Sequence, residues 1–182
     1  MKIERTEFRD LIVIHGTVHS DERGSFQEVF NEAHFRVETG LNISFVQDNE
    51  SISGAHVLRG LHLQLPPKGQ AKLVRVAQGS VLDVVVDLRK TEPTYGRHFK
   101  ILLSATNATR LFIPEGFAHG FLSLEDNTIF SYKCSNYYSK ELERGVRWND
   151  PELAIDWGIS TPQVSERDAL ALNLSQFDNP FF

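Results

Sequence analysis

The sequence contains a single cysteine, Cys134, so an internal disulfide and a cysteine-rich metal site are both excluded. No apolar run approaches the roughly 18 residues that a membrane-spanning helix needs, and the first residues lack the apolar core of a secretory signal. Basic residues are not in excess either: the net charge is −5, which argues against general affinity for nucleic acids. We therefore expect a cytoplasmic protein that binds neither membranes nor nucleic acids.

The composition that remains is that of one globular domain. The 182 residues are 41% hydrophobic and 24% charged, and a chain of this length buries roughly 70% of its unfolded surface. Short β-rich runs alternate with glycine and proline turns, and helical periodicity is rare. This pattern favours an all-β sandwich or barrel with short peripheral helices. We expect a single domain over 1–182, with a barrel core at about 25–138 and a C-terminal wrap with a short helix over 139–182.

Individual strands can be placed from the alternation of side chains. The strongest is 81–88, which a turn at Gly79 would join to 71–76 as a hairpin. Asn31 and Gly40 are suited to begin and end a short helix between them. Further strands are expected at 11–14, 25–30, 43–49, 98–103, 109–113 and 128–134.

The stretch 59–76 concentrates titratable side chains around a proline turn. Of these, His62 exchanges protons most readily near neutral pH, and Lys72 follows ten residues later, beyond Pro66 and Pro67. In an antiparallel sheet such a turn can bring both side chains to one cavity. A base beside a fixed cation suits proton removal from a carbon next to a carbonyl. The alternative is a strand-turn-strand with a hydrogen-bonded histidine and solvated charges.

Two other expected strands carry polar side chains on faces that a plain core would keep apolar. Glu28 lies between Phe26 and Phe30 in the alternation, and Gln47 and Asn49 share a face. These groups either line a pocket or occupy an edge and hydrogen-bond to nearby backbone.

Three more residues are candidates with a structural alternative. His119 follows a Pro-Gly turn, where a buried histidine bonded to backbone is equally plausible, and Tyr132 is compatible with core packing. Ser165 and Asp168 form a Ser-x-x-acid start to a short helix, which would make Asp168 a capping residue.

Histidines in a β-barrel raise the question of a metal. Cupin metalloenzymes usually offer a His-x-His pair on one strand, whereas His62 is followed by Leu63 and Gln64. The segment from Pro114 to His119 does resemble the later cupin motif. Without the first pair, three or four protein ligands are hard to assemble, so no metal is expected.

From about residue 23 to residue 168 the chain resembles the dTDP-4-dehydrorhamnose 3,5-epimerase family, cofactor-free enzymes with a cupin-type jelly-roll fold. The motifs that carry the resemblance, specific together though weak singly, are Arg23-Gly24-x-Phe26-x-Glu28, Gln47-x-Asn49-x-Ser51, Leu58-Arg59-Gly60-Leu61-His62, Gln70-x-Lys72-Leu73-Val74, Asp83-Val84-x-Val86-Asp87, Pro114-x-Gly116-Phe117-Ala118-His119-Gly120-Phe121, Tyr132-Lys133 and Trp148-x-Asp150-Pro151.

The resemblance implies roles for particular residues. His62 would be the base, Tyr132 the acid, and Lys72 the cation near the developing enolate, while Asp168 would orient His62. Asp83, on a mixed face of strand 81–88, is the alternative partner of His62. Contacts to the nucleotide-sugar are implied for Arg23, Glu28, Gln47, Asn49, Arg59, His119 and Glu143, with Phe26 a candidate for stacking on thymine. Arg167 stands where the family usually has lysine, and Leu63 where it often has an aromatic residue.

The implied reaction inverts C3 and C5 of a dTDP-linked 4-keto-6-deoxyhexose, without metal or cofactor, in a homodimer whose N-terminal strands cross over. The alternatives are a sibling 3- or 5-epimerase, a ketoisomerase, or a barrel that only binds a sugar nucleotide.

Overall fold

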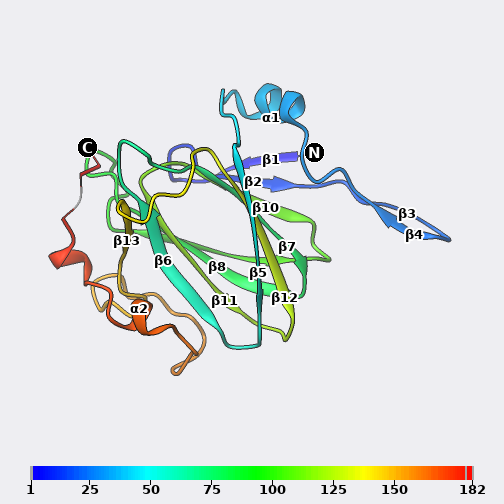
Figure 1. Ribbon diagram of the computed structural model, residues 1–182. Coiled ribbons are helices and arrows are strands. Elements are labelled where there is room, and N and C mark those ends of the chain that lie inside the picture. Colours follow the sequence, from blue (N-terminus) through cyan, green and yellow to red (C-terminus); the bar gives the residue numbers. More distant parts are fainter. Residues whose placement is uncertain (1, 179, 182) are drawn as a thin grey trace.

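Two antiparallel β-sheets face each other in the computed structural model, which describes residues 2–178 and 180–181 (Figure 1). The six-stranded sheet has the order β1 (Lys2–Arg5), β2 (Ile12–His15), β10 (Thr109–Ile113), β7 (Lys72–Gln78), β12 (Thr128–Cys134) and β5 (Gln47–Ser53). The five-stranded sheet has the order β13 (Glu143–Gly145), β6 (Leu58–Gln64), β11 (Phe117–Ser123), β8 (Ser80–Asp87) and β9 (His98–Ser104).

This is the all-β sandwich that the sequence predicted, and helices are few. The helix α1 (Glu32–Thr39) begins at Asn31, whose side chain accepts a hydrogen bond from the His34 amide, and ends at Gly40 with a φ of 75°. The helix α2 (Glu166–Ala169) and a 3₁₀ turn (Leu174–Gln176) lie in the C-terminal wrap. No helix within the described residues is long and apolar enough to cross a membrane.

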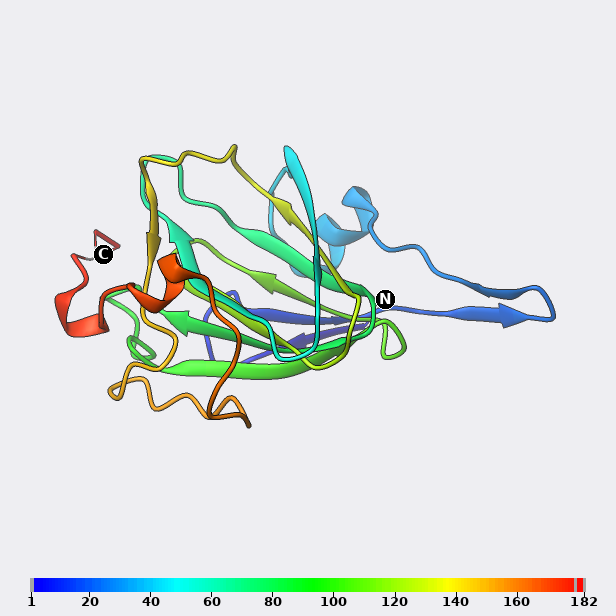
Figure 2. The same cartoon turned by 60° about the horizontal axis from the view of Figure 1, so that its bottom comes forward.

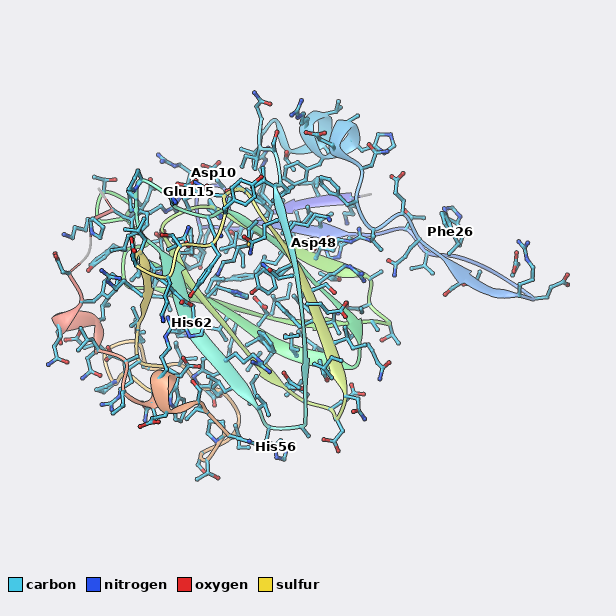
Figure 3. The ribbon with its side chains drawn as sticks, in the orientation of Figure 1. Asp10, Phe26, Asp48, His56, His62 and Glu115 are labelled. Carbon is cyan, nitrogen blue, oxygen red and sulfur yellow. The ribbon has the colours of Figure 1, made fainter. Side chains whose placement is uncertain are left out.

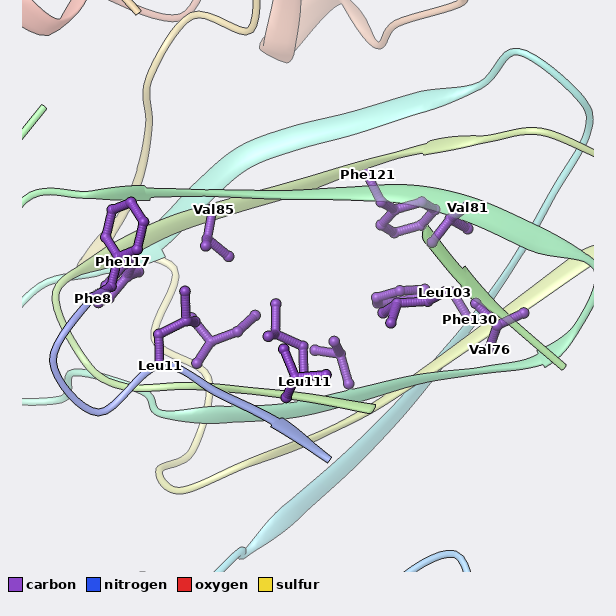
Figure 4. Packing of buried hydrophobic residues seen from close by; sticks show 13 residues of the cluster. Phe8, Leu11, Val76, Val81, Val85, Leu103, Leu111, Phe117, Phe121 and Phe130 are labelled. Carbon is purple, nitrogen blue, oxygen red and sulfur yellow. The ribbon is translucent and has the colours of Figure 1, made fainter. Parts of the chain in front are cut away.

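The main hydrophobic core lies between the two sheets (Figure 4). Side chains from both sheets meet there because alternate residues of each strand point inward. Phe121 and Phe130, from opposite sheets, stack with ring centroids 4.1 Å apart. Both rings also line the cavity described below, so the core borders directly on the polar side chains there.

Both outer faces of the sandwich are also covered in part. On the five-stranded sheet, the C-terminal wrap lays Leu153, Trp157 and Phe181 over apolar residues such as Val84 and Val86. On the outer face of the six-stranded sheet, Phe35 of α1 packs in a smaller hydrophobic cluster with Ile12, Ile14, Leu73 and Phe112. The strand 81–88 therefore has two buried faces, as its two apolar rows predict.

The expected hairpin between 71–76 and 81–88 is wrong. Strands β7 and β8 belong to opposite sheets, and Gly79, with a φ of 76°, lies in the short connection between them. A Cβ at that position would come within 2.4 Å of the Thr128 hydroxyl oxygen. The turn that looked like a hairpin signal is a corner of the sandwich.

Residues 19–30 also depart from the expected strand at 25–30. The strand β4 (Gly24–Phe26) pairs only with β3 (His19–Asp21), and this two-stranded hairpin projects away from the body of the molecule (Figures 1 and 2). Every residue of the two strands is exposed. The expected strand at 43–49 likewise begins later, at Gln47.

Candidate active site

The site lies between the two sheets, where His62 and Lys72 line the same cavity. Its volume is about 440 Å³, within the range of small-ligand sites. The two residues do not come from paired strands: His62 lies on β6 in one sheet and Lys72 on β7 in the other. The proline turn of 59–76 therefore carries the chain from one wall of the cavity to the opposite wall.

His62 forms a pair with Asp168. Its Nε2 lies 2.6 Å from Asp168 Oδ1, and the Gly60 amide donates to the other carboxylate oxygen at 3.2 Å. The N-cap of α2 is Ser165, whose hydroxyl accepts a hydrogen bond from the Asp168 amide, and the Asp168 side chain faces His62. Because a carboxylate only accepts, Nε2 carries the proton and Nδ1 of the neutral ring offers a lone pair.

Burial and hydrogen bonding act in opposite directions on this carboxyl group. Burial raises the pKa of Asp168, whereas the hydrogen bond and charge of His62, with the Gly60 amide, lower it. The net pKa lies below its ordinary value, so Asp168 stays ionised at neutral pH and holds the His62 ring in place.

Tyr132 and Lys72 face His62 from the opposite sheet. The Lys72 ammonium lies 6.0 Å from the centroid of the Tyr132 ring, on the neighbouring strand. Burial lowers the pKa of Lys72, opposed by the Cys134 thiol and by the carboxylates of Asp83 and Glu143, and burial raises the pKa of Tyr132. A phenol that keeps its proton and a partly desolvated cation thus share one wall.

Asp83 has a different histidine as its partner. His119 Nε2 lies 2.9 Å from Asp83 Oδ2, and both side chains are buried. The alternative pairing of Asp83 with His62 is therefore not found. Within the part of the chain that the structure describes, no three His, Cys, Asp or Glu side chains converge in a group that could hold a metal ion.

Known proteins resemble this chain over most of its length. The family model described as dTDP-4-dehydrorhamnose 3,5-epimerase matches residues 5–176. The chain belongs to this family. The epimerase of that name from Shigella flexneri is 48% identical over 168 residues, which cover 92% of this chain and 93% of the relative.

Solved structures of the family share both fold and sequence. The epimerase from Elizabethkingia anophelis NUHP1 has a TM-score of 0.92 and 47% identity, with 98% of each chain covered. A dTDP-6-deoxy-D-glucose-3,5-epimerase from Legionella pneumophila, solved with dTDP-4-keto-L-rhamnose, has a TM-score of 0.93 and 42% identity, covering 97% of this chain and 94% of that one. The jelly roll of these epimerases is the fold described above.

Most of the other residues that the family resemblance singled out lie around the cavity. Arg59 is held by the Ser53 hydroxyl and the Ile52 carbonyl, at 3.1 and 3.3 Å. Gln47, Asn49 and Glu143 line an adjoining pocket of about 280 Å³, which shares His62, Lys72 and Tyr132 with the first cavity. There Gln47 donates to Asn49 at 3.0 Å, and Glu143 pairs with Arg167 at 2.7 Å. His119 completes this group beside His62.

Arg23, Phe26 and Glu28 are not brought into this cavity. Arg23 pairs with its neighbour Asp21 at 2.6 Å, and Glu28 accepts hydrogen bonds from Asn31 and His34. The Phe26 side chain is 71% exposed on the projecting hairpin, far from His62 (Figure 3). Within one chain, these three residues form a separate group.

Tyr138 is a lining residue that the sequence did not reveal. Its hydroxyl donates to Glu143 Oε2 at 2.6 Å, while its backbone amide donates to Gln47 at 2.8 Å. It follows the last long strand, where the alternation of side chains has ended. The signal in the sequence was the pair of consecutive tyrosines, Tyr137 and Tyr138, after the last long strand; both are exposed in the structure.

Proposed function

We propose that this protein epimerises C3 and C5 of dTDP-4-dehydro-6-deoxy-D-glucose, giving dTDP-4-dehydro-L-rhamnose for dTDP-L-rhamnose synthesis. The observation that carries the proposal is the placement of His62 and Tyr132 on opposite sheets, across one cavity. Inversion of a carbon needs proton removal from one face and proton return to the other. A base and an acid on facing walls supply both.

The C4 ketone makes the reaction possible at both carbons, because it acidifies the protons at C3 and at C5. His62 Nδ1 takes the proton, and the electrons of the broken C–H bond move to the C4 oxygen as an enolate. Lys72 stabilises that negative charge. Tyr132 then protonates the carbon from the opposite face, and solvent exchange restores the neutral imidazole and the phenol.

Binding of the nucleotide requires local positive charge, since the protein carries a net charge of −5 and the diphosphate is anionic. Arg59 and Arg167 lie on the cavity and have the fork geometry that suits phosphate oxygens. Gln47, Asn49 and Glu143 are proposed to contact the rest of the nucleotide-sugar. The proposal includes no metal and no cofactor, and it places the protein in the cytoplasm.

We also propose a homodimer in which the β3–β4 hairpin of one protomer reaches the cavity of its partner. The hairpin leaves the body of its own chain and exposes Phe26, Arg23 and the adjacent Glu28 (Figures 2 and 3). An exposed phenylalanine suits stacking on the thymine base, and Arg23 suits the diphosphate.

Solvent-deuterium exchange tests the proposed reaction. The protein is incubated with dTDP-4-keto-6-deoxyglucose in heavy water, and C3 and C5 are followed by NMR, with His62→Ala as the control. Label at both carbons that is lost in the variant supports the double epimerase and its base. Label at one carbon indicates a single epimerase. Label at neither carbon indicates a barrel that only binds sugar nucleotides, or another substrate.

A further inference from the structure

Two histidine–aspartate pairs lie side by side in this cavity. His62 and His119 are register partners on the adjacent strands β6 and β11. The strands approach closely at Gly60 and Gly120, where an added Cβ on Gly60 would lie 2.5 Å from the Gly120 Cα. The first pair, His62–Asp168, already has a role as the base, and the second, His119–Asp83, does not.

The second pair has a defined arrangement of donors and acceptors. His119 Nε2 faces the Asp83 carboxylate at 2.9 Å, so the proton of the neutral ring resides on Nε2. Nδ1 has no hydrogen-bond partner among the described residues, although the ring lines the cavity. Phe130 stacks on the ring with centroids 5.9 Å apart, which limits its rotation.

The charges around His119 also keep it neutral. Burial lowers the pKa of His119, opposed by Asp83, and the nearby Lys72 and His62 lower it further. A protonated His119 would add a positive charge to a cavity that Lys72, Arg59 and Arg167 already line. The neutral ring therefore offers one free group, an acceptor at Nδ1.

Asp83 is fully buried and uses only part of its hydrogen-bonding capacity. Its Oδ1 has no partner in the described part of the chain, which is unusual for a buried carboxylate oxygen. Lys72 faces the same interior, and the Asp83 charge raises the pKa of that lysine against the effect of burial. A residue that only filled the core would not need this carboxylate.

We propose that Asp83 is a positioning residue that holds His119 in its Nε2–H tautomer, so that Nδ1 accepts a hydrogen bond from a hydroxyl group of the hexose. The proposal rests on the proposed function, since the ligand is the sugar of the dTDP-linked substrate. The two histidine–aspartate pairs then have different roles. His62–Asp168 moves protons, whereas His119–Asp83 holds the hexose ring of the substrate so that its C–H bonds face His62.

Nitrogen-15 NMR of the ligand-free protein tests the tautomer directly. With histidine-labelled protein at neutral pH, we expect a pyridine-type shift for His119 Nδ1 and a pyrrole-type shift for Nε2, assigned by loss of the signals in His119→Gln. In Asp83→Asn the amide can donate to Nε2, so the two shifts should exchange. A protonated His119, or a pyrrole-type Nδ1 in the wild type, would overturn the proposal.

Calorimetry then tests the contact with the sugar. The ligands are dTDP, which lacks the hexose, and dTDP-L-rhamnose, which has it but lacks the reactive ketone. We expect Asp83→Asn to weaken dTDP-L-rhamnose binding about tenfold, the effect of one lost hydrogen bond, and to leave dTDP binding unchanged. Equal weakening of both ligands, or of neither, would overturn the contact.

The two proposals can fail separately. If Asp83→Asn does not fold, the wild-type spectrum still decides the tautomer, and His119→Gln, which keeps an amide donor for Asp83, decides the sugar contact by the same pair of titrations. If wild-type protein fails to label its substrate in heavy water, the epimerase function is lost while the tautomer result stands. If the wild type labels both carbons but His119 Nδ1 carries the proton, only the positioning role is lost.

Discussion

His62 and Asp168 are 106 positions apart in the sequence, and their side chains meet at 2.6 Å. The C-terminal wrap makes this contact possible by placing α2 against β6, where the Gly60 amide also donates to the carboxylate. The base of the proposed reaction therefore depends on a residue outside the β-sandwich. Its orientation is set when the wrap docks.

Replacing Asp168 with Asn should impair the proton transfer more than the binding of substrate. An amide can donate to Nε2 and so favours the wrong tautomer of His62. We expect kcat to fall by roughly 10²–10⁴-fold with little change in KM. The rate of deuterium incorporation at C3 and C5 measures the effect. Asp156→Asn, an exposed aspartate of the same wrap, is the matched control. An unchanged kcat would remove Asp168 from the proposed mechanism.

Tyr132→Phe should separate proton exchange from inversion. In the proposed mechanism His62 can still remove a proton and exchange it for a deuteron of the heavy water, but no acid remains on the opposite wall. His62 therefore returns the deuteron to the face from which the proton left. The recovered sugar should therefore carry deuterium with its original configuration at C3 and C5. NMR coupling constants report the configuration, and mass spectrometry reports the label. Inverted product formed at the wild-type rate would show that another group is the acid.

The strands with a clear alternation of side chains, such as 81–88, were predictable from the sequence, whereas the bounds of β4 and β5 and the assignment of the strands to sheets were not. Gly79 reads equally well as a hairpin turn or as a corner, and only the packing of both faces of β8 decides between them. The grouping of His62 and Lys72 was predicted, whereas the reason for it, two facing sheets, was not. Tyr138 was missed because loop residues have no periodicity.

The pH dependence of the reaction should show the loss of the Lys72 charge at alkaline pH. Burial lowers the pKa of this lysine below its ordinary value of 10.5, while burial raises the pKa of Tyr132 above 10.0. In the proposed mechanism Lys72 acts as a cation, so activity should decline as pH rises through its lowered pKa, and this alkaline limb should lie below pH 10.5. Deuterium incorporation rates across pH measure it.

Lys72→Arg provides the comparison for this limb. The guanidinium stays protonated over the whole accessible range, so the variant, though slower, should lack the alkaline decline. If the limb persists at the same pH in Lys72→Arg, it belongs to another group.

The ion pair between Arg89 and Asp87 should contribute to stability and not to catalysis. Arg89 donates to both oxygens of the fully buried Asp87, at 2.8 and 2.7 Å, and stacks on Phe117; none of the three lines the cavity of His62. Arg89→Ala leaves a buried carboxylate without its cation, and we expect a loss of about 3–5 kcal/mol in the free energy of unfolding. Urea titration measures it, with the exposed neighbour Lys90→Ala as control. A loss under about 1 kcal/mol, the size expected for a surface ion pair, would show that water or Thr94 satisfies the Asp87 carboxylate in place of Arg89.

Mixed dimers can show whether the hairpin acts on the partner's cavity. Phe26→Ala alone should raise KM about tenfold to a hundredfold, as expected for a lost stacking contact with a base. Consider a dimer in which one protomer carries Phe26→Ala and the other carries His62→Ala. If each hairpin acts on the partner's cavity, one cavity has both defects and the other has neither. That dimer, purified with two different tags, should show wild-type KM and half the wild-type kcat. If each hairpin instead serves its own chain, no native site forms and KM stays raised. A monomer in sizing chromatography would contradict the arrangement from the outset.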